Sequence, residues 1–205
     1  MKFTEKAKIE IIFGDGQFDR QVIKEALEKN KDKYCQISLF IPESGGKGKG
    51  RIINTGIDGV LKFVKDDVTR FSLSYIVFID KEHCYFDYEN CIRTVANKYG
   101  ISISALQKIA ENFDAYKVTC KVGDKKFFIY FIFLGFYCCL EDFILIKICN
   151  SNVNKFTGEG CCKKYKEIFK RVQKEVKESC IEKTYDELFK VIACVLEELT
   201  TLETF

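Results

Sequence analysis

Residues 8–19, Lys-Ile-Glu-Ile-Ile-Phe-Gly-Asp-Gly-Gln-Phe-Asp, change from the pattern of a strand to that of a helix within a few positions. Lys8–Phe13 is rich in β-branched and aromatic side chains, and this run stops at Gly14. From Gln17 to Asn30 the apolar side chains recur at helical spacing. The stretch therefore predicts a buried strand, a short glycine-containing turn and a helix that packs on the strand.

The same alternation continues along the chain. Cys35–Ile41 and Leu73–Ile79 have the composition of strands, and Ile57–Val64 lies between them with the spacing of a short helix. Strands that alternate with helices form parallel sheets with right-handed crossovers. The sequence therefore predicts an α/β fold with a mostly parallel sheet flanked by helices, and such sheets bind ligands beyond the carboxyl ends of their strands.

The middle of the chain mixes both patterns. Tyr88–Tyr99 and Ser102–Phe113 are predicted as two helices, separated by Gly100. Tyr116–Lys121 and Lys126–Leu134 are predicted as strands, and the Gly-Asp pair between them is typical of a hairpin. The residues 140–148 that follow are predicted to form a short helix.

Two amphipathic helices are expected after Asn150, at Lys163–Glu178 and Tyr185–Leu199, where apolar side chains form one stripe on each segment. The sequence thus predicts an α/β domain over residues 1–150. It also predicts that residues 151–205 form a C-terminal helical extension, a helical pair packed on that domain.

Composition excludes several classes of protein. The chain has 205 residues, of which 47% are hydrophobic and 31% are charged, so it is not a disordered chain. Its net charge of +3 is too small to indicate nucleic-acid or membrane binding by itself. The apolar run Phe127–Leu140 is shorter than the roughly 20 residues that a membrane span needs. We therefore expect no membrane association.

Cysteine is frequent, with eleven residues in the chain. No Cys-x-x-Cys pair occurs, and the adjacent pairs Cys138-Cys139 and Cys161-Cys162 are poor chelators because neighbouring side chains diverge on regular structure. His83 is the only histidine. The sequence therefore favours reduced, buried thiols in a cytoplasmic protein over a zinc site, while intracellular disulfides remain open for a hyperthermophilic source.

Acidic residues follow the predicted first and third strands. Asp15 comes after the first, and Asp80 and Glu82 come after the third. Carboxyl ends of neighbouring parallel strands meet at one edge of a sheet, and Mg²⁺ (or Mn²⁺) prefers carboxylate ligands. Asp80 and Glu82 are therefore predicted metal ligands, and Asp15 a ligand or general acid–base, making all three candidate catalytic residues. Glu141, at the start of a later helix, is a fourth candidate ligand. The alternative is that these acids only cap helices.

Two motifs give the chain a family resemblance. Asp15-Gly16-Gln17-Phe18-Asp19 matches an acidic residue, Gly, two variable residues and Asp, and Ile79-Asp80-Lys81-Glu82 matches a strand ending in Asp-x-Asp. In these motifs the chain resembles the Toprim family, which includes topoisomerases, primases and the overcoming-lysogenization-defect nucleases. Gly45-Gly46-Lys47 and Leu140-Glu141-Asp142 are similar to features of stand-alone Toprim-like proteins of uncharacterised function. The resemblance covers roughly residues 8–148.

The resemblance implies a Toprim-like fold and Mg²⁺-dependent phosphodiester chemistry on nucleic acid, with a homodimer or a separate partner protein. Two departures affect it. Asp15 stands where the family normally has Glu, and Glu82 stands where it has the second Asp. Each keeps the charge and moves the carboxylate by one methylene, a scale to which metal geometry is sensitive.

A glycine-rich basic loop lies between the two motifs. Lys47, Lys49 and Arg51 alternate there with glycines and are predicted to contact phosphates; the alternative is a solvated crossover. Three functions follow from the sequence. The first is a Mg²⁺-dependent, nuclease-like phosphodiester enzyme. The second is a non-catalytic Toprim-like binding or regulatory module. The third is a nucleotide-binding α/β protein that uses the glycine-rich loop.

Overall fold

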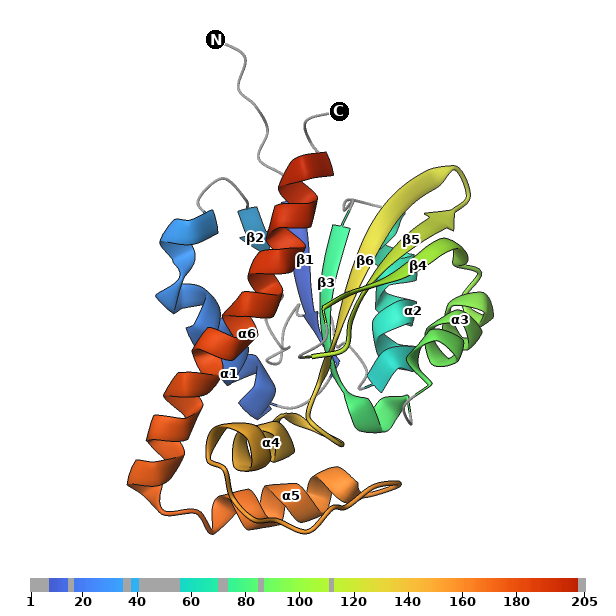
Figure 1. Ribbon diagram of the computed structural model, residues 1–205. Helices are drawn as coiled ribbons and strands as arrows, with labels where there is room; N and C mark the ends of the chain where they lie inside the picture. Colours follow the sequence, from blue (N-terminus) through green and yellow to red (C-terminus); the bar gives the residue numbers. More distant parts are fainter. Residues whose placement is uncertain are drawn as a thin grey trace, which may run out of the picture.

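The computed structural model describes residues 8–14, 17–34, 38–40, 56–69, 74–84, 87–110 and 113–202. Within this part, six strands form one sheet in the order β2-β1-β3-β6-β5-β4 (Figure 1). The strands are β1 (Lys8–Phe13), β2 (Ser38–Phe40), β3 (Ser74–Asp80), β4 (Ser102–Ala110), β5 (Ala115–Val122) and β6 (Lys125–Leu134). The helices are α1 (Gln17–Lys29), α2 (Gly56–Val68), α3 (Tyr88–Lys98), α4 (Leu140–Phe143), α5 (Cys161–Lys170) and α6 (Lys174–Leu202).

The sheet is parallel in its first half and antiparallel in its second. β1 pairs in parallel with β2 and β3, and β3 pairs in parallel with β6. β6 then returns through a hairpin to β5, which pairs antiparallel with β4. The hairpin turns at Gly123, whose φ of 57° suits glycine. The predicted α/β class, the parallel pairing and the hairpin are all confirmed.

Helices cover both faces of the sheet, because side chains of a strand alternate between its two sides. On β3, Ile76 and Phe78 pack in the apolar cluster that contains α1 and α6, whereas Tyr75, Val77 and Ile79 pack with α2 and α3. Every residue of β3 is buried, as expected for a central parallel strand.

The prediction of a helix at Ser102–Phe113 is wrong. Residues 102–110 form the edge strand β4, not a helix. The apolar residues Ile103, Leu106 and Ile109 stand three apart, which is a helical spacing. The strand accommodates it through shifts of register between Ile103 and Ala105 and between Lys108 and Ala110, where β-bulges or irregularities break the two-residue alternation.

The C-terminal helical pair is present, but its boundary differs from the prediction. α5 ends at Lys170, and α6 runs without interruption from Lys174 to Leu202, so there is no break near residues 179–184. No glycine or proline marks the turn at residues 171–173, which is why the pattern misplaced it. Leu188 and Ile192 of α6 share one apolar cluster with Ile11 of β1, so α6 packs directly on the α/β core.

The apolar run at residues 127–140 consists of most of β6, the turn that follows it and the first residue of α4. Among the described residues, no helix combines the length and the apolar character that crossing a bilayer requires.

A hydrogen bond between α6 and α1 allows the packing of α6 on the α/β core to be tested by mutation. The Tyr185 hydroxyl donates to the Glu25 carboxylate. Replacing Tyr185 with phenylalanine keeps the ring and removes the bond, so we expect the free energy of unfolding in urea to fall by roughly 1 kcal/mol. In a Glu25→Gln background the same substitution should cost less, and an equal cost in both backgrounds would contradict a direct interaction.

Candidate functional site

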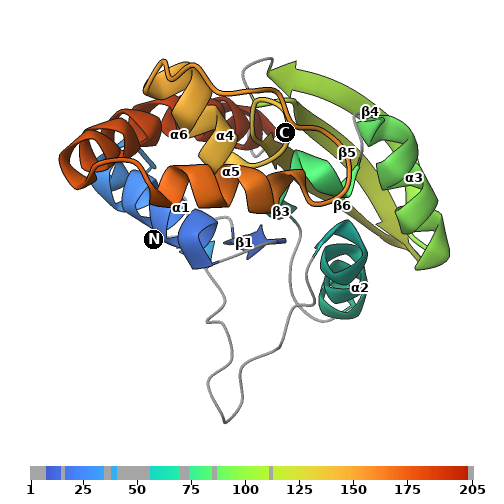
Figure 2. The same cartoon turned by 90° about the horizontal axis from the view of Figure 1, so that it is seen from below.

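The carboxyl ends of the parallel strands are covered by the chain that leaves β6. The final residue of β3, Asp80, lies opposite Leu134, the final residue of β6. Beyond β6 the chain turns through residues 135–139 into α4, and α5 later crosses beneath the strand ends (Figures 1 and 2). This edge is the one at which parallel sheets bind ligands.

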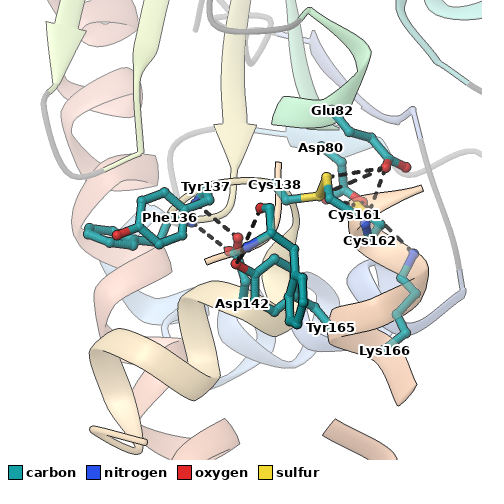
Figure 3. The surroundings of a disulfide bond; sticks show 11 residues. Asp80, Glu82, Phe136, Tyr137, Cys138, Asp142, Cys161, Cys162, Tyr165 and Lys166 are labelled. Atoms are coloured by element: carbon teal, nitrogen blue, oxygen red, sulfur yellow. Dashed lines mark hydrogen bonds and ion pairs between the residues drawn. A yellow bond between two sulfur atoms is a disulfide. The ribbon is translucent and has the colours of Figure 1, made fainter. Parts of the chain in front are cut away.

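Asp142 fixes the turn that follows β6. Its carboxylate accepts hydrogen bonds from the backbone N–H groups of Phe136 (2.7 Å) and Tyr137 (2.9 Å) (Figure 3). Burial raises the pKa of this carboxyl group to about 6, although backbone N–H groups of the turn, which favour the ionised form, oppose the shift. The turn also begins at Gly135, whose φ is 113°. Asp142 is therefore a structural carboxylate that shapes the turn.

The same turn is joined to the short 3₁₀ helix Lys81–His83 that follows β3. The backbone N–H of Glu82 donates to the carbonyl of Cys138 at 3.1 Å. This hydrogen bond fixes the position of the Glu82 backbone relative to the turn at the edge of the sheet.

Three buried carboxylates act on one lysine of α5. The Lys166 ammonium lies 3.9 Å from Asp80 Oδ2. Burial disfavours the charged ammonium, but the charges of Glu141, Asp80 and Asp19 outweigh it and raise the pKa of Lys166. Asp80 is 0% exposed, and the other two carboxylates are also buried. Lys166 is therefore a permanent cation within an acidic cluster.

The structure brings together Asp80 and Glu82 of the predicted site. Glu141 is near enough for its charge to act on Lys166, the lysine that also faces Asp80. Both Asp80 and Glu82 face the first turn of α5 (Figure 3). The Cys162 sulfur lies 3.7 Å from Asp80 Oδ2, and the Cys162 N–H donates to Glu82 Oε2 at 3.4 Å. The remaining predicted residues, Asp15, Lys47, Lys49 and Arg51, lie outside the described residues.

Both cysteine doublets meet at this edge, which the sequence did not predict. Cys138 is bonded to Cys161, and the Cys138 and Cys162 sulfurs lie 3.2 Å apart. The Cys138 and Cys161 sulfurs lie 3.9 and 3.8 Å from Glu82 Oε2. Adjacent cysteines diverge, but here the two doublets come from different segments and face each other.

The cysteines are also not all reduced. Among the described residues, disulfides join Cys84 to Cys91, Cys138 to Cys161 and Cys149 to Cys180, while Cys120, Cys139, Cys162 and Cys194 are free. The expectation of reduced thiols is therefore wrong at six positions.

The two free thiols of the site are held in the neutral form. A hydrogen bond with Cys139, burial and the charge of Asp80 raise the pKa of Cys162. The bond with Cys162 lowers the pKa of Cys139, but burial and neighbouring carboxylates outweigh it and raise the value to about 12. Neither thiol is a nucleophile near neutral pH, because the thiolate is the reactive form.

A solvent-open cavity of about 640 Å³ lies beside the cluster. Among the described residues, its walls contain three glutamates, three lysines of α5 and three other residues: Glu82, Glu159, Glu167, Lys163, Lys166, Lys170, His83, Gly160 and Cys162. Carboxylates and ammonium groups on one wall suit a ligand that carries phosphate with a bound cation. The sequence did not place these lysines at the site, because only the position of α5 over the strand ends brings them there.

The chain matches no protein-family model, and no curated protein or solved structure is significantly similar to it.

Proposed function

We propose that the protein is a Mg²⁺- or Mn²⁺-dependent phosphodiester enzyme of nuclease type, acting on nucleic acid at the carboxyl edge of a Toprim-like sheet. The observation that carries this is the meeting of two kinds of group at one cavity. Glu82 stands on its wall with Asp80 directly behind, and lysines of α5 stand beside them. Carboxylates hold a hard divalent cation, and the cation with the lysines neutralises the charge of a phosphodiester.

The roles divide by position. Glu82 and Asp80 would hold the cation, with Glu141 supporting its charge and Asp15 serving as a further ligand or general acid–base. Lys166 would contact a non-bridging phosphate oxygen, together with Lys47, Lys49 and Arg51 of the glycine-rich loop. The cation supplies charge neutralisation at the phosphoryl group when bound.

The size of the cavity also limits the range of possible substrates. Its volume of about 640 Å³ falls within the ~300–1,000 Å³ of small-ligand sites. A cavity of this size admits a nucleotide or a single-stranded end, and it is too small to enclose a duplex. We therefore propose single-stranded DNA or RNA as the substrate.

A second function is favoured by the burial of Asp80. This carboxylate is completely buried, and Cys162 and Lys166 of α5 lie against it. A protein that keeps this arrangement unchanged would bind a phosphate-bearing partner without cleaving it, as a regulatory module.

Cleavage assays distinguish the two functions. Purified protein is incubated with single-stranded DNA, duplex DNA and RNA, each with Mg²⁺, Mn²⁺ or a chelator. We expect metal-dependent cleavage of single strands. Asp80→Asn and Glu82→Gln should each slow it by at least about 100-fold, since each weakens the hold on a cation that contributes several kcal/mol of transition-state stabilisation.

Glu187→Gln is the matched control, because Glu187 of α6 lines a separate cavity, together with Lys33 and Lys147. It should leave cleavage unchanged. Absence of cleavage with salt-sensitive binding would favour the regulatory module. Cleavage that survives both Asp80→Asn and Glu82→Gln would overturn the proposed site.

A further inference from the structure

The cysteine doublets and Glu82 form a second group of potential ligands at the same edge. The sulfurs of Cys138, Cys161 and Cys162 and a carboxylate oxygen of Glu82 all lie within 4.8 Å of one another (Figure 3). Zn²⁺ accepts both thiolate sulfur and carboxylate oxygen in tetrahedral sites, whereas Mg²⁺ prefers oxygen ligands.

Two of the six separations lie close to those of such a site, and the other ligand atoms are near enough to reach it by small shifts. Zn–S bonds of about 2.3 Å and tetrahedral angles place ligand atoms roughly 3.5–3.8 Å apart. The Glu82 oxygen lies 3.9 Å from the Cys138 sulfur and 3.8 Å from the Cys161 sulfur, and the Cys138 and Cys162 sulfurs lie 3.2 Å apart. The edge that departs most from a tetrahedron joins Cys138 to Cys161, where a covalent bond holds the sulfurs together.

We propose that reduction of the Cys138–Cys161 disulfide converts this cluster into a Zn²⁺ site formed by Cys138, Cys161, Cys162 and Glu82. The oxidised form cannot bind in this way, because a disulfide sulfur is not a thiolate. The cluster is thus a redox-controlled metal site, and its existence does not depend on the proposed phosphodiester activity.

The chemistry balances with a dithiol as reductant. The dithiol gives two electrons and two protons to the S–S bond and leaves as a disulfide, while Cys138 and Cys161 become thiols. Zn²⁺ then replaces the protons of three thiols, which pass to solvent, and the Glu82 carboxylate completes the coordination.

Binding of Co²⁺, a spectroscopic substitute for Zn²⁺, tests the proposal. The protein is reduced with a phosphine, freed of reductant without oxygen, and titrated with Co²⁺; untreated protein is titrated in parallel. We expect one Co²⁺ per reduced chain, with a thiolate-to-cobalt charge-transfer band and tetrahedral d–d bands that Zn²⁺ abolishes. Untreated protein should show neither band.

Variants locate the ligands. Cys162→Ser should raise the dissociation constant by more than about 100-fold, since losing even an outer partner of a ligand costs roughly 10–100-fold. Glu82→Gln, whose side chain is only half-buried, should keep the thiolate band and weaken binding. Circular dichroism verifies that each variant is folded. If Cys162→Ser does not fold, Glu82→Gln alone tests the assignment of the ligands.

Cys194→Ser and Cys91→Ser are the controls, since Cys194 is exposed and Cys91 belongs to another disulfide. Both should bind Co²⁺ as the wild type does. Equal binding by reduced and untreated protein, or unchanged binding by folded Cys162→Ser or Glu82→Gln, would overturn the proposal. Because the readout is metal binding, its failure is distinct from a failure of the cleavage assay.

Discussion

Alanine in place of Gly135 is expected to lower the free energy of unfolding by at least about 3 kcal/mol. Gly135 has a φ of 113°, a backbone conformation that is strained for any residue with a Cβ. An added Cβ would also lie 2.5 Å from the backbone nitrogen of Cys139 and 2.8 Å from its carbonyl oxygen. Both neighbours are backbone atoms, so relief requires the turn itself to move.

A second glycine, Gly123, allows the cost of backbone strain to be measured separately from the cost of a steric clash. Gly123 also has a positive φ, 57°, but a Cβ there would meet no atom within 4 Å. Gly123→Ala should cost about 1–2 kcal/mol, the strain of the left-handed conformation alone. Denaturant unfolding of both variants measures the difference, and equal losses would show that the turn after β6 is looser than described.

Stability should fall as the pH rises from about 4 through about 6, because of Asp142. The pKa of its carboxyl group is raised from the ordinary 3.8 to about 6. Below about pH 4 the group is protonated in both the folded and the unfolded chain, and its contribution is fully present. As the pH rises, the unfolded chain loses the proton first, and the folded chain must then bury an ionised carboxylate. A difference of about two pKa units corresponds to roughly 3 kcal/mol lost above pH 6.

Asp142→Asn removes this titration. Urea unfolding of wild type and variant at a series of pH values should give curves whose separation changes by roughly 3 kcal/mol in favour of asparagine between pH 4 and pH 7. Asp124→Asn, an exposed change in the hairpin turn, should run parallel to the wild type throughout. If the Asp142→Asn curve is also parallel to the wild-type curve, the pKa of Asp142 is not raised in the folded protein.

Much of the fold follows from local sequence pattern. The buried strand β3 contains a continuous apolar run at residues 75–79, and the turn at Gly123 marks the hairpin, so both are predictable. The edge strand β4 is not, because register shifts give Ile103 and Leu106 the spacing of a helix. The boundary between α5 and α6 also escapes prediction, since the turn at residues 171–173 lacks a glycine or proline.

The site was predictable only in part. Asp80 and Glu82 could be placed at the sheet edge because they lie where a strand ends. The approach of Cys161, Cys162 and Lys166 depends on how α5 lies beneath that edge, about 80 residues later in the chain. No spacing rule records such a contact, because the two doublets are brought together by tertiary packing and not by one motif.

The position of α5 gives this region an all-or-none character. The sheet contributes carboxylates, whereas α5 contributes two sulfurs and the ammonium group that lies against Asp80. If α5 separates from the strand ends, the acids lose their counter-charge and the thiols lose their neighbours in the same event. The Cys138–Cys161 crosslink ties the first residue of α5 to the turn after β6. Cutting that tether therefore both frees the sulfurs and loosens the helix that presents them, so chelation and re-docking of α5 would be thermodynamically coupled.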